Sequence, residues 1–289
     1  MATADQSPDS GKRQSNARFF WRALAYFVAL ALVNTAGYRG LDLALSGVTP
    51  AWVPGLAESL AYLAGVLALT WAFCHFFDHK PVADLGLHRQ GSLVKLAAGL
   101  GLGILLQVVI FAALALAGWL SVERAPWQPV ELSISILSWL VISFNEELAF
   151  RGYIMQRLSL AWGMPAAVIA SSLVFAAVHL LNPNFQPLAF VSLFAAGLLL
   201  AAAYLVSKSL WLPIGLHIAW NLMEVQVFGF PGSGITEPAL LRSAVHGPEL
   251  LAGGAFGPEG GLVGIAAPLV GIAILLIAGS IIRARKAHI

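Results

Sequence analysis

Eight long apolar stretches alternate along the chain with short segments that are polar or rich in glycine and proline. A helix needs about 20 apolar residues to cross the hydrocarbon core of a membrane. The fifth and seventh stretches are the weakest candidates, because they are short or contain proline. The pattern predicts an all-α, polytopic membrane helix bundle with about eight transmembrane helices. The expected helices span residues 19–37, 53–77, 92–120, 132–157, 165–181, 186–206, 210–229 and 262–282.

The flanking segments set the expected organisation. Residues 1–17 are polar and unpatterned, which predicts a disordered cytoplasmic tail before a single transmembrane domain at 18–289. The first apolar stretch begins later and runs longer than the core of a cleaved signal peptide, so we expect an uncleaved span. With eight spans, most basic residues fall on one side, which predicts an integral plasma or inner membrane protein with both termini cytoplasmic. The basic residues on that side are Lys12, Arg13, Arg18, Arg22, Lys80, Arg89, Lys95, Arg157, Lys208, Arg283, Arg285 and Lys286.

Composition agrees with this picture. The 289 residues are 59% hydrophobic and only 10% charged, whereas soluble domains carry about 25% charged residues. The net charge of +2 gives no reason to expect a nucleic-acid partner; the lipid bilayer is the expected surrounding. The lone cysteine, Cys74, excludes an internal disulfide framework and is expected to be a packing residue.

The fourth stretch contains three charges in SFNEELAFRGYI, residues 143–154. One charged side chain at the centre of a membrane helix costs about 2.5–3.5 kcal/mol. Glu147 and Arg151 are four residues apart and can pair on one helix face. Glu146 is turned by about 100° from Glu147 and cannot share the arginine as easily. A structural charge cluster therefore explains Glu147 and Arg151, while Glu146 is a free carboxylate expected to face the bundle interior.

Two further spans carry polar residues at helical spacing. Phe175 and His179 are four residues apart in the fifth, and His217 and Asn221 are four apart in the seventh. A lone histidine in an apolar helix is usually a core residue with a satisfied hydrogen bond. Two histidines, an asparagine and an unpaired glutamate on three helices instead favour one shared site, because polar groups in a bilayer need partners.

Two hydrolytic chemistries fit these residue types. Glu146 can act as a general base that takes a proton from water, while a histidine and an asparagine stabilise a developing oxyanion. Alternatively, Glu146, His179 and His217 can bind Zn²⁺ and leave an open position for water. The positive charge of Arg151 slightly favours the mechanism without a metal, but the residues leave both open.

These motifs resemble those of the CPBP intramembrane proteases, which include CAAX prenyl endopeptidases and bacteriocin-processing or self-immunity proteins of the Abi type. The family pattern Glu-Glu-x-x-x-Arg, Phe-x-x-x-His and His-x-x-x-Asn occurs here in order, within a motif-bearing core at 132–225. A weaker similarity lies in DLGL, residues 84–87. The roles that the resemblance implies are Glu146 as catalytic carboxylate, His179 as its partner, His217 and Asn221 as oxyanion stabilisers, and Glu147, Arg151 and Phe175 as supporting residues.

The resemblance implies an endopeptidase that acts on a membrane-embedded or lipidated, CAAX-like protein. Family members are described both as metalloproteases and as metal-independent glutamic proteases, so either Zn²⁺ or no cofactor is expected. The alternatives are a non-proteolytic immunity or scaffold protein and a proton-coupled transporter that uses the carboxylate as a relay. The Gly/Pro-rich loop at 230–261 is either a surface connection with an interfacial helix near 238–252 or a lid.

Overall fold

Long apolar helices dominate the computed structural model, which describes residues 8–50 and 52–287. Within these residues, seven helices are long and apolar enough to cross a membrane. Their spans are Asn16–Gly37, Trp52–Asp78, Ser92–Leu116, Pro129–Trp162, Met164–Leu181, Pro187–Ser207 and Leu262–Ala284. The chain is therefore an all-α, multi-pass integral membrane protein, as predicted.

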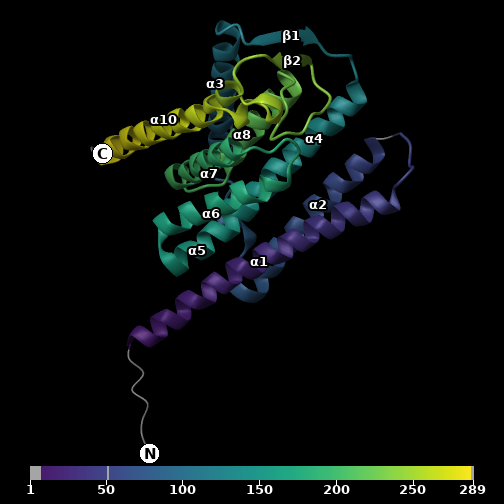
Figure 1. Cartoon of the computed structure of the whole chain (residues 1–289). Helices are drawn as coiled ribbons and strands as arrows, with labels where there is room; N and C mark the ends of the chain where they lie inside the picture. Colours follow the sequence, from purple (N-terminus) through teal and green to yellow (C-terminus); the bar gives the residue numbers. More distant parts are fainter. Residues whose placement is uncertain (1–7, 51, 288–289) are drawn as a thin grey trace, which may run out of the picture.

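Figure 1 shows α1 and α2 side by side along one side of the bundle, with α3, α7, α8 and α10 grouped on the other and α4 to α6 between them. The α-helices are α1 (Pro8–Ala44), α2 (Trp52–Ala72), α3 (Ser92–Leu116), α4 (Pro129–Glu146), α5 (Met155–Trp162), α6 (Met164–Val178), α7 (Pro187–Ser207), α8 (Trp211–Asn221), α9 (Glu249–Ala252) and α10 (Leu262–Ala287). Wider π-helical turns follow α2 (Phe73–Asp78), α4 (Glu147–Ile154) and α8 (Leu222–Val227). Short 3₁₀ turns lie at Val82–Leu85, His179–Leu181, Gly254–Phe256 and Pro258–Gly260.

The first helix begins earlier than expected. Helix α1 starts at Pro8, inside the segment predicted to be a disordered tail, while residues 1–7 lie outside the described part of the chain. The division into a tail at 1–17 and one domain at 18–289 stays a prediction.

The seventh expected span, 210–229, is a short and deeply buried helix. Helix α8 and its π-helical continuation cover residues 211–227, roughly 25 Å at 1.5 Å per residue. This segment runs parallel to α3: Leu212 lies beside Gly99 at one end, and the rings of Phe228 and Phe111 stack with centroids 4.3 Å apart at the other. It therefore follows most of the length of α3 through the bundle, although it is too short to be a clear span by itself.

Glycines allow α3 and α8 to pack with their backbones in contact. A Cβ at Gly99 would lie 2.1 Å from the carbonyl oxygen of Leu212, and a Cβ at Gly215 would lie 2.3 Å from that of Leu96. No side chain fits such gaps, so this contact requires glycine on both helices. The packing fixes the position of α8, which carries His217 and Asn221.

A two-stranded antiparallel ribbon lies at one end of the bundle (Figure 1). Strand β1 (Leu120–Arg124) pairs with β2 (Leu241–Val245), and the opposite charges of Glu123 and Arg242 face each other in register. The expected helix at 92–120 therefore ends at Leu116, and the interfacial helix expected near 238–252 is wrong except for the single turn of α9. Both segments are strands because each pairs with the other, which is distant in sequence. A pattern within one segment cannot reveal such a partner.

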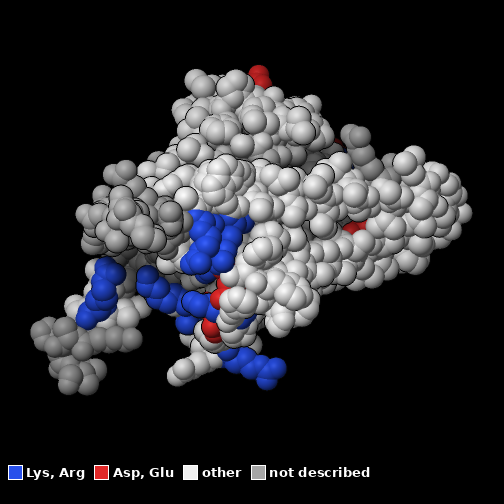
Figure 2. Space-filling view, turned by 90° about the horizontal axis from the view of Figure 1, so that it is seen from below, with Lys and Arg blue, Asp and Glu red and all other residues white. Residues whose placement is uncertain are grey.

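Basic residues gather on the face seen from below the view of Figure 1, with few acidic atoms among them (Figure 2). Asp78 joins α1 to α5, because its carboxylate contacts Arg22 at 2.9 Å and Arg157 at 3.0 Å. Cys74 lies one turn away and is buried in the core, as expected. The side of the membrane on which the termini lie stays a prediction.

Candidate active site

The three motif-bearing helices depart from α-helical geometry next to the predicted site residues. Glu146 is the last residue of α4 and Asn221 the last of α8, and a π-helical segment follows each of them. His179 begins the 3₁₀ turn after α6. Irregular turns of these kinds are frequent at functional sites. Each of these irregular turns begins at or directly after a predicted site residue.

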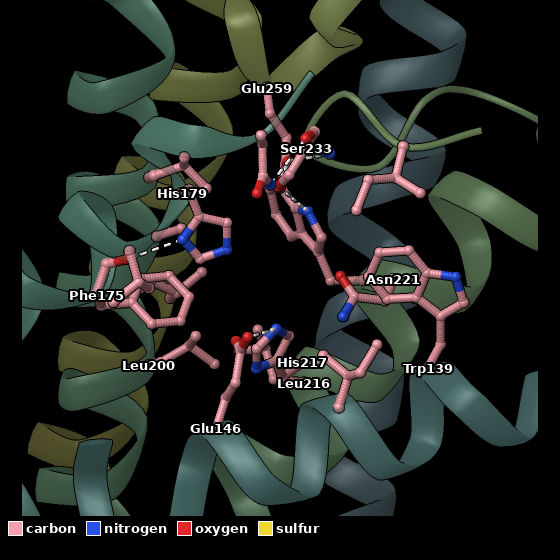
Figure 3. Close-up of a pocket in the computed structure, with 18 of the residues that line it drawn as sticks. Trp139, Glu146, Phe175, His179, Leu200, Leu216, His217, Asn221, Ser233 and Glu259 are labelled. Carbon is pink, nitrogen blue, oxygen red and sulfur yellow. Dashed lines mark hydrogen bonds and ion pairs between the residues drawn. The ribbon is translucent and has the colours of Figure 1, made fainter. Parts of the chain in front are cut away.

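All four predicted catalytic residues line one cavity of about 210 Å³. Figure 3 shows Glu146 and His217 at one end of this cavity, His179 on one wall and Asn221 on the opposite wall. Apolar side chains, including Leu200 of α7, complete the walls. The structure thus brings together residues that are separated by as much as 75 positions in the sequence, 221 − 146.

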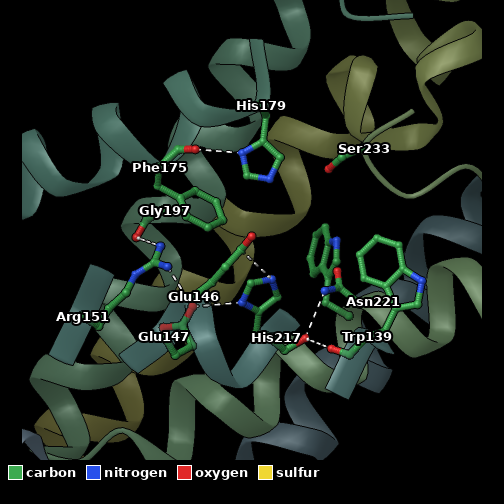
Figure 4. A network of polar contacts seen from close by, with 12 residues as sticks. Trp139, Glu146, Glu147, Arg151, Phe175, His179, Gly197, His217, Asn221 and Ser233 are labelled. Carbon is green, nitrogen blue, oxygen red and sulfur yellow. Dashed lines mark hydrogen bonds and ion pairs between the residues drawn. The ribbon is translucent and has the colours of Figure 1, made fainter. Parts of the chain in front are cut away.

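Glu147 and Arg151 form the predicted ion pair, with Arg151 Nη1 2.7 Å from Glu147 Oε1 and both side chains almost fully buried. Arg151 also donates to the carbonyl oxygen of Gly197 at 3.2 Å. The same Glu147 oxygen accepts a second hydrogen bond, from His217 Nδ1 at 2.9 Å (Figure 4). Glu147 therefore orients the histidine of α8 as well as pairing with the arginine, a contact that helical spacing within one span could not predict.

Phe175 and His179 form the second group. His179 Nδ1 donates to the carbonyl oxygen of Phe175 at 2.8 Å, because a carbonyl oxygen can only accept. The other ring nitrogen of His179, Nε2, takes no part in this hydrogen bond. The Phe175 ring lies 5.0 Å from the His179 ring and 6.1 Å from the His217 ring, and Arg151 Cζ lies 4.4 Å from its centroid. Phe175 therefore contacts both imidazoles and covers the arginine.

Within the described part of the chain, no arginine forms an ion pair with the Glu146 carboxylate, because Arg151 pairs with Glu147 instead. Its Oε2 lies 3.8 Å from His217 Nε2, which is too long for a direct hydrogen bond but allows one water to contact both atoms. Asn221 Nδ2 donates to Ser143 Oγ at 3.1 Å, and Ser143 Oγ donates to the carbonyl oxygen of Trp139 at 2.8 Å. Asn221 is thus held from the same helix that carries Glu146.

The loop at 230–261 contributes to the cavity, in agreement with the lid interpretation and against a simple surface connection. Ser233, Ile235 and Glu259 all line the cavity. Glu259 Oε1 accepts a hydrogen bond from Trp220 Nε1 at 2.9 Å, and Oε2 accepts from the Ser233 amide at 3.0 Å. Sequence reasoning missed Glu259, Ser233 and Trp220, because an acid in a Gly/Pro-rich loop resembles a surface residue. The length of that loop was the only signal.

The alternative zinc set does not fit the geometry of the described residues. Glu146, His179 and His217 face the same cavity, but no three His, Cys, Asp or Glu side chains within 8–50 and 52–287 are placed to hold one metal ion. The positive charge of Arg151, which pairs with Glu147 beside His217, also disfavours a bound cation at this end of the cavity.

The fold and the cavity define a multi-pass membrane protein with a buried carboxylate–histidine site. Residues 126–223 match the family model described as type II CAAX prenyl endopeptidase Rce1-like, which confirms the resemblance for the segment that carries all three motifs. The match points to a protease of the CAAX type. No curated protein and no solved structure shows a significant match to this chain.

Proposed function

We propose that this protein is an intramembrane endopeptidase in which Glu146 activates water to hydrolyse a peptide bond. The observation that carries the proposal is the free carboxylate of Glu146 beside His217 Nε2, in a cavity that also holds His179 and Asn221. A structural ion pair needs only Glu147 and Arg151, which already contact each other at 2.7 Å. The family match to a CAAX prenyl endopeptidase supports the same reaction class.

In the proposed mechanism, water binds between Glu146 and the two imidazoles. Because His179 Nδ1 donates to Phe175, its Nε2 is the acceptor that can hold one hydrogen of this water. Glu146 takes the other proton as the hydroxide oxygen bonds to the peptide carbonyl carbon. The proton then passes from Glu146 to the leaving nitrogen as the C–N bond breaks, which yields a carboxylate and an amine.

The developing oxyanion is stabilised by two donors, Asn221 on the opposite wall and His217 beside Glu146. The amide nitrogen of Asn221 carries two hydrogens, of which one is donated to Ser143 and the other is available to the oxyanion. His217 donates from Nε2 when both of its ring nitrogens carry a proton, while its Nδ1 is held by Glu147. Donors fixed in advance in a dry site lose little energy to reorganisation, and removing one of them typically costs 10²–10³ in kcat.

The proposed substrate is a membrane-embedded or lipidated, CAAX-like protein. Leucines of α7 and α8 form part of the cavity wall, and α1 and α2 contribute Asn34 and Tyr62. The cavity therefore joins an apolar wall to a few polar groups, which suits a peptide bond presented on an apolar segment. The family description supports a prenylated substrate in particular.

The test is cleavage of a panel of prenylated and transmembrane peptides by the purified protein. We expect Glu146→Gln to lower kcat/KM by about 10²–10⁴-fold, the range for loss of a general base. Glu131→Gln is the matched control, since Glu131 lies in the first turn of the same helix and is exposed. Equal loss in both variants, or cleavage by Glu146→Gln at close to the wild-type rate, would contradict the proposal. Failure of the wild type to cleave any peptide would favour the non-proteolytic or transport alternatives.

A further inference from the structure

Glu259 is a buried carboxylate that no motif includes. It lies in the 3₁₀ turn Pro258–Gly260, just before α10, and the residue is 6% exposed. In Figure 3 it points from the end of the loop toward Ser233, across the end of the cavity that lies away from Glu146. A buried carboxylate is costly unless its oxygens are hydrogen-bonded, so its contacts indicate what holds it there.

Both oxygens of Glu259 accept hydrogen bonds from other parts of the site. Oε1 accepts from the Trp220 indole at 2.9 Å, and Oε2 accepts from the Ser233 amide at 3.0 Å and from the Ser233 hydroxyl at 2.5 Å. These bonds join three segments that are far apart in sequence: α8, the start of the loop at 230–261 and its end. We call Trp220, Ser233 and Glu259 the Glu259 clamp.

The clamp is connected to both walls of the cavity. Trp220 directly precedes Asn221, so its indole is anchored beside the proposed oxyanion donor. On the other wall, Asn182 Nδ2 donates to the carbonyl oxygen of Ser233 at 3.0 Å, and Asn182 directly follows the 3₁₀ turn that begins at His179. A chain of hydrogen bonds therefore runs from Asn182 through Ser233 and Glu259 to Trp220. It connects the end of the helix that carries His179 with the helix that carries Asn221.

From this geometry we infer that Glu259 is a positioning residue, which fixes the loop over the cavity. By holding Trp220 and Asn182, it keeps the neighbouring residues Asn221 and His179 at the distance from each other that the reaction requires. The inference rests on the proposed peptidase function. Asn221 acts on the oxyanion, which forms only in the transition state, so loss of its position should lower kcat more than it raises KM.

The variants are chosen to remove single contacts. Glu259→Gln replaces one of the two carboxylate oxygens with an NH₂ group, which would face the donor of either Trp220 or Ser233. Trp220→Phe removes the indole donor but keeps a ring. Glu249→Gln is the matched control, because Glu249 is an exposed carboxylate of the same loop.

The first measurement is steady-state cleavage by the full-length protein. We expect Glu259→Gln and Trp220→Phe each to lower kcat by about tenfold or more with KM changed less than threefold, as for the loss of one hydrogen bond to a charged acceptor. We expect the double variant to be no worse than the worse single variant, because both remove the same link. The positioning role would be overturned if the fold-losses of kcat in the two single variants multiplied in the double variant, or if Glu259→Gln left kcat unchanged.

The second measurement does not depend on activity. Amide hydrogen exchange of the detergent-solubilised protein should become about tenfold faster in peptides from 230–261 in Glu259→Gln, with peptides from α4 unchanged. Unchanged exchange in the loop, or faster exchange throughout the chain, would overturn the clamp. Wild-type protein that cleaves no peptide would instead refute the proposed function, and the exchange result would still decide whether the clamp exists.

Discussion

Replacing Arg151 with methionine tests the buried charge network on which the site depends. The Arg151 side chain is about 1% exposed, and it contacts Glu147 at 2.7 Å, the Gly197 carbonyl at 3.2 Å and the Phe175 ring. Arg151→Met removes the positive charge but keeps an apolar side chain of similar length. The carboxylate of Glu147 is then left buried with only the imidazole of His217 as a partner.

The expected cost follows from this uncompensated charge. Removing one partner of a buried ion pair typically destabilises a protein by about 3–5 kcal/mol. Replacing both partners by neutral groups of similar volume is often close to neutral. We therefore expect Arg151→Met to lower the free energy of unfolding by about 3–5 kcal/mol, and Glu147→Gln/Arg151→Met to lower it by less than about 2 kcal/mol.

The assay is unfolding in detergent micelles followed by intrinsic tryptophan fluorescence, with Arg89→Met as the control because Arg89 is exposed in a loop. The control should stay within about 0.5 kcal/mol of wild type. A double variant no more stable than Arg151→Met would refute the reasoning. It would show that Arg151 stabilises the fold through packing on Phe175 and not by compensating the charge of Glu147.

Three further predictions test the packing, the oxyanion wall and the cofactor. Gly99→Ala should destabilise the protein by about 1–3 kcal/mol or more, since its Cβ would lie 2.1 Å from a backbone oxygen. Gly101→Ala is the control and should be neutral or stabilising, because the space around Gly101 is open. Equal effects of the two substitutions on stability would contradict the close packing of α3 on α8. Ser143→Ala should lower kcat by about 2- to 10-fold by releasing Asn221, and an unchanged kcat would show that this hydrogen bond is dispensable. Activity should survive exhaustive chelation within about twofold; activity that disappears with the metal and returns on adding Zn²⁺ would overturn the mechanism without a metal.

The sequence predicted the membrane helices because a helix that crosses a bilayer satisfies its own backbone, so length and hydropathy determine it locally. It was least successful for residues 211–227. This segment is buried by its packing on α3, and its course depends on glycine contacts with a helix more than 100 positions earlier. The β1–β2 ribbon was missed for a similar reason, since each strand has only five residues and is paired across 116 intervening positions, 241 − 124 − 1.

The site was partly predictable because each motif places two residues on one helix. Glu147 and Arg151 pair as their four-residue spacing predicted. The shared hydrogen bond of Glu147 with His217 and the clamp at Glu259 could not be predicted, because they join different helices and a loop. The π-helical turns after Glu146 and Asn221 also leave no clear trace in the residue pattern.

The most direct measurement of the central claim is single-turnover cleavage in H₂¹⁸O, with the product and the protein both examined by mass spectrometry. If Glu146 activates water for direct attack, the heavy oxygen should appear in the new carboxylate of the peptide and not in the protein. Glu146→Gln should give this labelled product about 10²–10⁴-fold more slowly. Heavy oxygen in the carboxylate of Glu146 would instead indicate a covalent intermediate on that residue. Labelled product from Glu146→Gln at the wild-type rate would contradict a catalytic role for Glu146 altogether.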